Sequence, residues 1–166
     1  MGDRLLCPTM ALYGDPDISF CHPDEWQLRT IAGFAQSVAF QSPTIVVVRE
    51  PMVEGDTAQL HAQRKLFALR TMQDFALLES ASVTLDGVPA ARVRYSYTTE
   101  EGTIEQSQTF VLAPADRDTK VVTSFLTTAR KADADAVRPA FAAALASVRF
   151  ASPMPTPGSH GAGAKG

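Results

Sequence analysis

The stretch Val83-Thr84-Leu85-Asp86-Gly87-Val88-Pro89-Ala90-Ala91 decides how this chain folds. It joins two runs, 75–85 and 88–98, that we interpret as strands. An Asp-Gly pair between two such runs is a strong signal for a tight β-hairpin. Because a hairpin joins neighbouring antiparallel strands, the stretch predicts an antiparallel sheet built around it.

Elements on either side of the hairpin complete the pattern. The further strands we expect are 18–21, 28–34, 44–49, 104–112 and 120–128. A helix is expected at 56–72, with Asp56 as its N-cap, and an alanine-rich helix at 135–148 with Pro139 near its start. This order predicts an α+β fold, an antiparallel β-sheet with two main helices.

The length of 166 residues suits one domain with its own core. We expect an irregular N-terminus at 1–10, a folded α+β domain at 11–150, and a disordered tail rich in Pro and Gly at 151–166.

Composition argues against two classes of partner. The chain has 15 basic and 18 acidic residues, a net charge of −3. Such a balance provides no basic face for nucleic acid and no polybasic membrane anchor. The N-terminus lacks the apolar stretch of a signal peptide, and no window reaches the ~18 apolar residues of a membrane span. We therefore expect a cytoplasmic protein.

No catalytic or metal-binding motif stands out in the sequence. There is no Gly-rich phosphate loop, no nucleophile elbow and no zinc-protease spacing among the three histidines. His61 is expected at the surface of its helix. Cys7 and Cys21 are expected to be reduced thiols, with a single disulfide left open as the alternative. We predict no enzyme activity, no catalytic residues, no metal and no cofactor.

Side-chain alternation points to a binding face. Gln106, Gln108 and Phe110 lie on one side of their strand, while the strand 44–49 is apolar on both sides. Two helices need not cover both faces of the sheet, and an exposed apolar face usually marks a binding site. Burial of the second face under termini and loops is an equally open alternative.

The order of elements also resembles a known group, the DcrB/PsbP-like family, and within it the Eag chaperones of type VI secretion. The resemblance covers about 15–150. The stretches that carry it are Asp17-Ile18-Ser19-Phe20, Pro23-Asp24-Glu25-Trp26, Val46-Val47-Val48-Arg49-Glu50, Gly55-Asp56, Asp86-Gly87-Val88-Pro89-Ala90-Ala91, Tyr95-Ser96-Tyr97, Ser107-Gln108-Thr109-Phe110 and Thr123-Ser124-Phe125-Leu126-Thr127-Thr128.

The resemblance implies a PsbP-like fold and a function. Eag chaperones bind and shield the transmembrane (pre-PAAR) helices of a PAAR-containing effector before export. By position, Gln108 is similar to a groove glutamine of that family, and Ile31, Val46 and Val48 to apolar groove positions. Gln106 and Phe110 join this predicted client-binding set because they share the strand side of Gln108.

Other functions stay open at this point. One is a non-catalytic binding or assembly module of the same fold with another protein partner, such as a regulator of a GTPase. An enzyme is the least favoured alternative. A homodimer is compatible with the sequence, since the resemblance implies chaperones that act as pairs around a client.

Overall fold

The computed structural model describes residues 10–14, 18–23, 43–113 and 120–151. The predicted strand 28–34, the residues 1–9 and most of the predicted tail therefore lie outside the described residues.

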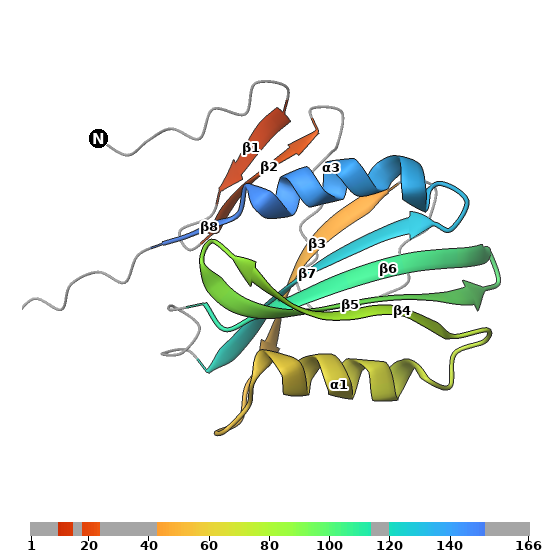
Figure 1. The fold of residues 1–166 in the computed structure, drawn as a ribbon, viewed down its shortest axis with the longest axis horizontal. Coiled ribbons are helices and arrows are strands. Elements are labelled where there is room, and N and C mark those ends of the chain that lie inside the picture. The colour runs from red at the N-terminus through yellow and green to blue at the C-terminus, as the bar shows by residue number, and fades with distance from the viewer. Residues whose placement is uncertain (1–9, 15–17, 24–42, 114–119, 152–166) are drawn as a thin grey trace, which may run out of the picture.

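A five-stranded antiparallel sheet forms the centre of the molecule (Figure 1). The strands in spatial order are β3 (Thr44–Pro51), β7 (Val121–Arg130), β6 (Gly102–Val111), β5 (Val88–Thr99) and β4 (Ala76–Leu85). β4 and β5 form the predicted hairpin, and both turn residues have positive φ, 48° for Asp86 and 74° for Gly87. Asp and Gly tolerate that conformation, which is why the pair marks the turn. The α+β fold class is confirmed.

A smaller sheet packs beside the large one. It contains β1 (Met10–Gly14), β2 (Ile18–Pro23) and β8 (Arg149–Phe150), in the order β1-β2-β8. Only β2 was predicted. β8 spans two residues directly after a helix, too short to carry an alternating pattern.

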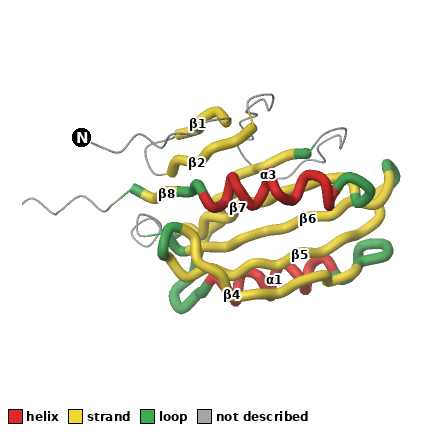
Figure 2. Tube along the Cα trace, turned by 45° about the horizontal axis from the view of Figure 1, so that its top comes forward, coloured by secondary structure: helices red, strands yellow, loops and turns green. Residues whose placement is uncertain are grey.

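Two helices cover opposite faces of the large sheet (Figures 1 and 2). α1 (Ala58–Leu69) packs mainly on β5 and β6, and α3 (Ala134–Ala146) packs on β7 and β2. One core therefore lies under each helix. The α1 core includes Ala62, Val93 and Phe110, whereas the α3 core includes Phe125 and Val148.

The start of α1 corrects a prediction. The N-cap is Thr57, whose hydroxyl accepts a hydrogen bond from the Leu60 N–H at 3.2 Å. Asp56 instead accepts from the Val53 N–H at 3.1 Å and pairs with Arg64 at 2.8 Å. A carboxylate and a hydroxyl side by side can both serve as caps, and sequence alone does not choose between them.

His61 and Cys21 also differ from expectation. His61 is only 8% exposed, and its Nε2 lies 2.9 Å from Asp56 Oδ2, so it is a buried histidine and not a surface one. Cys21 is buried and disulfide-bonded, which corrects the expectation of two reduced thiols. In the described part of the chain, no helix is long and apolar enough to cross a membrane.

Candidate functional site

The predicted client-binding residues of the described chain share one face of the large sheet, the face on which α1 packs. Strand register aligns them in rows that run across the strands. Val46 pairs with Leu126, which pairs with Gln108; in the next row, Val48 pairs with Ser124, which pairs with Phe110. Direct cross-strand partners point to the same side of a sheet. Ile31 lies outside the described residues.

The half of this face formed by β3 and β7 lies beside α1 and not beneath its centre, because α1 packs mainly on β5 and β6. Three apolar side chains there, Val46, Val48 and Leu126, are only half-buried. Ser124 and Thr128 lie on the same side of β7 and are buried. We call these five residues the β3–β7 strip. It combines half-buried apolar side chains with small buried hydroxyls.

Two buried glutamines border the strip on β6. The Gln106 amide donates to Thr128 Oγ1 at 3.0 Å, and its carbonyl oxygen accepts from the Tyr97 hydroxyl at 3.3 Å. Gln106 is therefore satisfied at both ends. The Gln108 amide donates to Ser124 Oγ at 2.7 Å. Both glutamines thus hold β7 hydroxyls in place.

The carbonyl oxygen of Gln108 is different, because it is buried and has no hydrogen-bond partner within the described structure. Gln108 is 1% exposed, so bulk water does not reach it in this conformation. An unsatisfied buried acceptor typically costs about 1–3 kcal/mol. The face therefore contains an acceptor that a donor from another molecule would stabilise.

Phe110 has a structural setting that the glutamines do not share. It is 0% exposed and belongs to the core beneath α1, and its ring centroid lies 6.3 Å from that of His61. Its predicted contact with a client therefore requires movement of α1, whereas Val46 and Val48 are already partly exposed.

Buried tyrosines close the α1 side of the site. Tyr95 and Tyr97 stack with ring centroids 6.3 Å apart, and burial raises the pKa of each phenol above its usual value. Both hydroxyls therefore stay protonated at neutral pH. The Tyr95 hydroxyl, like the Gln108 carbonyl, is buried without a partner among the described residues.

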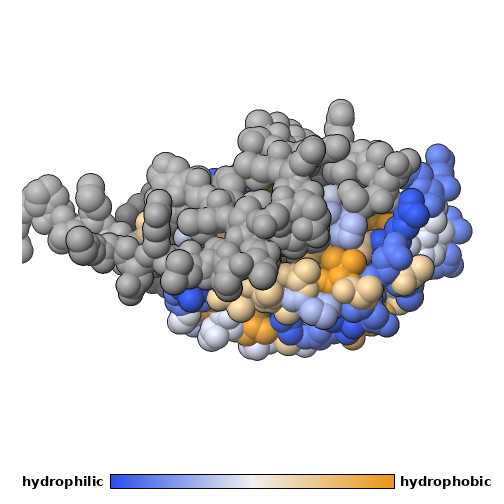
Figure 3. All heavy atoms as spheres, turned by 90° about the horizontal axis from the view of Figure 1, so that it is seen from above, coloured by the Kyte–Doolittle hydropathy of each residue, from blue (hydrophilic) through white to orange (hydrophobic). Residues whose placement is uncertain are grey.

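Sequence reasoning missed the partners on β7 and Tyr97. Each face of β7 has both apolar and hydroxyl side chains, so alternation along the strand could not show that Ser124, Leu126 and Thr128 belong to the site. Only the register between β6 and β7 selects them. Where described residues are visible in Figure 3, hydrophobic and hydrophilic side chains are mixed.

Comparison with solved structures shows the same fold in several bacterial proteins. PA94 of Pseudomonas aeruginosa, a protein of unknown function suggested to be a regulator, is 23% identical, with a TM-score of 0.56 over 89% of this chain and 99% of that one. LpqN of Mycobacterium tuberculosis, involved in cell envelope biogenesis, is 18% identical, with a TM-score of 0.61 over 84% of this chain and 88% of LpqN. CyanoP, the PsbP of the cyanobacterium Synechocystis sp. PCC 6803, is 11% identical, with a TM-score of 0.61 over 86% of this chain and 93% of that one.

These similarities establish a DcrB/PsbP-like fold and say nothing by themselves of function. A search of curated proteins finds no significant match. The sequence profile of the DcrB family, however, matches residues 18–147, which include the hairpin, both helices and the whole β3–β7 strip. The chain belongs to the DcrB family.

Proposed function

We propose that this protein is a chaperone that binds and shields the transmembrane (pre-PAAR) segments of a type VI secretion effector before export. The observation that carries the proposal is the Gln108 carbonyl oxygen, which has no hydrogen-bond donor in the described structure and lies beside the half-exposed apolar side chains of the β3–β7 strip. The resemblance to Eag chaperones suggests the class of client. We further propose that binding takes place in the cytoplasm and without direct contact between this chain and a membrane.

The physical chemistry of such a client fits this surface. A transmembrane helix in water exposes apolar area, and each Å² removed from water contributes about 25 cal/mol. Val46, Val48 and Leu126 offer apolar contact without demanding one particular client sequence. A serine or threonine hydroxyl of the client, or an N–H at its helix start, would complete the hydrogen bonding of Gln108. Since Gln108 is buried, binding has to rearrange the side chains around it.

The direct test is co-expression with the N-terminal segment of a PAAR-containing effector encoded beside this chain. We expect the segment to stay in the soluble fraction and to co-purify only when this protein is present. Val46→Asp should abolish co-purification, because it places a charge in the apolar strip. Val53→Asp is the matched control, since Val53 is 62% exposed and lies outside the strip. Equal solubility of the segment with and without this protein would contradict the proposal.

A second candidate is a non-catalytic binding or assembly module with another protein partner. The disulfide of Cys21 favours this alternative, since disulfides persist mainly in oxidising compartments such as the bacterial periplasm. Cell fractionation with thiol alkylation separates the two candidates. The chaperone proposal expects the protein in the cytoplasmic fraction, whereas the alternative expects oxidised protein in the envelope fraction.

A further inference from the structure

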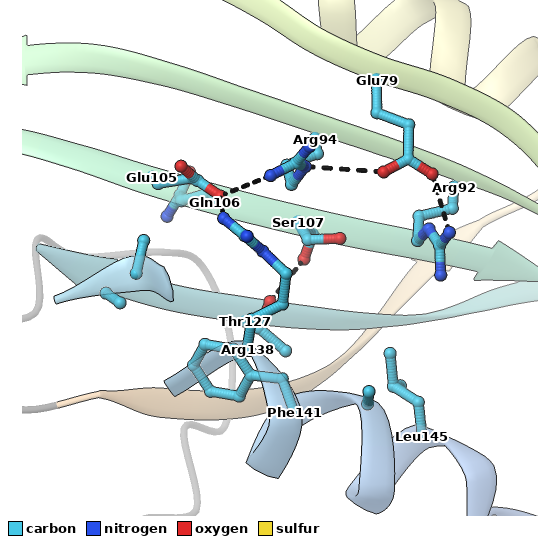
Figure 4. A pocket seen from close by; sticks show the side chains of 13 residues that line it. Glu79, Arg92, Arg94, Glu105, Gln106, Ser107, Thr127, Arg138, Phe141 and Leu145 are labelled. Carbon is cyan, nitrogen blue, oxygen red and sulfur yellow. Dashed lines mark hydrogen bonds and ion pairs between the residues drawn. The ribbon is translucent and has the colours of Figure 1, made fainter. Parts of the chain in front are cut away.

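A second site lies on the opposite face of the sheet, beneath α3 (Figure 4). It is a pocket of about 180 Å³ between the helix and strands β4 to β7. Its floor includes Glu79, Arg92 and Arg94, and α3 supplies Arg138 and Phe141. Gln106, one of the predicted client-binding residues, also lines the pocket, but none of the five residues of the β3–β7 strip does.

Ion pairs connect the polar side chains of the pocket. Arg92 donates to Glu79 at 2.7 Å, and Arg94 lies 3.5 Å from the other oxygen of the same carboxylate. Arg94 and Arg138 share one oxygen of Glu105, at 3.2 and 3.1 Å. The Arg92 guanidinium holds the pKa of Glu79 below its usual range, so Glu79 stays ionised at neutral pH.

Unpartnered donors in this cluster favour an added oxygen ligand. Three guanidinium groups and two carboxylates line the pocket, and Asp135, which lies 2.7 Å from Arg138, balances the third positive charge. The Nε–H of Arg92 is buried and has no hydrogen-bond acceptor in the described structure. The Nε of Arg94 is also buried and lies 3.5 Å from Glu79 Oε2, an ion-pair distance at which it makes no hydrogen bond. Buried donors without acceptors are unusual and mark a place where an oxygen ligand would be stabilised.

Gln106, Ser107 and Thr127 add uncharged polar groups to the lining, and the remaining lining residues are apolar. Ala129 comes from β7, and Phe141, Ala142 and Leu145 come from α3. A cavity of roughly 150 Å³ in another protein holds a benzene molecule, so a pocket of this size takes a compact organic molecule and not a polymer. A ligand that suits both walls has an anionic oxygen group and a small apolar body.

We infer that the pocket under α3 binds a small carboxylic acid with a compact apolar body, its carboxylate accepting from Arg92 and Arg94 and its body packing on Phe141 and Leu145. Arginine suits this role because its planar donors match the two oxygens of a carboxylate.

The test uses benzoate as the probe and the full-length protein at constant ionic strength. Binding is followed by chemical-shift changes of the backbone amides of β5, β6 and α3. We expect saturable changes with benzoate. Benzamide, which has the same shape without the charge, should bind about tenfold more weakly or worse. Inorganic phosphate tests whether an anion without an apolar body suffices.

Two variants locate the site. Arg92→Gln should weaken benzoate binding about tenfold or more, and Ala142→Phe should block it by filling the pocket. Arg70→Gln is the matched control, because Arg70 lies beyond the end of α1, away from the pocket. Thermal melting of each variant confirms folding. The inference is overturned if benzoate causes no saturable change, if benzamide or phosphate binds as well, or if folded Arg92→Gln and Ala142→Phe both bind benzoate normally.

Discussion

At the residue scale, two buried polar side chains behave in opposite ways. Asp56 has a 2% exposed side chain and is fully engaged by Arg64, the Val53 N–H and His61. Gln108 is as deeply buried, yet one of its two polar ends has no partner among the described residues. A satisfied group stabilises the fold, whereas an unsatisfied one is retained at a cost. This contrast is the reason why we treat Asp56 as a structural residue and propose a binding role for Gln108.

Gln108→Ala should weaken capture of the client segment about fivefold, because it removes a buried acceptor worth on the order of 1 kcal/mol. Quantitative co-purification measures the effect. Gln63→Ala, an exposed glutamine on α1, is the control and should bind normally. Unchanged capture by a folded Gln108→Ala variant would remove Gln108 from the site.

Asp56→Asn should lower the free energy of unfolding at neutral pH, and the stability of the variant should fall less than that of the parent protein as the pH is lowered. The Arg64 guanidinium, followed by the Val53 N–H, holds the pKa of Asp56 well below its usual range. A lowered folded-state pKa stabilises the fold fully above the unfolded-state pKa of about 3.9, and this contribution is lost as pH falls further toward the folded-state value. Urea midpoints of the two proteins should therefore converge below about pH 4. A constant difference down to acid pH would show that the ionisation of Asp56 is not the cause.

At the scale of elements, the parts predicted correctly are those with local signals. The Asp86-Gly87 pair by itself predicts a tight turn. The alternation of side chains along β6 places Gln106 and Gln108 on the same side of the strand, whatever the rest of the fold. The side on which α1 packs, and how far it extends over β6, depends on docking between distant segments. The burial of Phe110 beneath α1 therefore could not be read from its strand. β1 and β8 exist because β2 pairs with both, a non-local cause.

The start of α1 provides a direct test of this local reasoning. Thr57→Ala should destabilise the protein by about 1 kcal/mol, because it leaves the Leu60 N–H without its cap. Thr57→Ser should retain most of the stability, since serine keeps the hydroxyl. Chemical denaturation measures both. If Thr57→Ala has no effect, the capping contribution belongs to Asp56 after all.

At the scale of the whole molecule, one sheet separates two different surfaces. The α1 side combines a half-exposed apolar strip with uncharged hydrogen-bonding groups. The α3 side has a compact pocket with paired charges. Apart from Gln106, which borders the strip and also lines the pocket, the two surfaces share no residue, so substitutions elsewhere in one surface should leave binding at the other unchanged unless they unfold the protein. The two proposals can therefore fail separately.

The disulfide acts on the stability of the whole fold. Treatment with a reductant should lower the free energy of unfolding by about 2–4 kcal/mol, because the crosslink restricts the unfolded chain. Cys21→Ser should be destabilised to a similar extent and should not respond to the reductant. Thermal melting of both proteins with and without reductant checks this. An equal response of Cys21→Ser would mean that the reductant acts elsewhere.

The pairing of β2 with β8 has a consequence for the order of events during synthesis. Ile18 pairs with Phe150, and the Phe150 N–H also donates to Asp86 in the β4–β5 turn at 2.9 Å. The last residues of the domain thus join the first strands to the hairpin. On the ribosome, the N-terminus of the chain emerges first, so β2 can pair with β1 early, but its pairing with β8 has to wait until translation of the domain is complete. The large sheet can assemble earlier, and the closing step is the arrival of a two-residue strand.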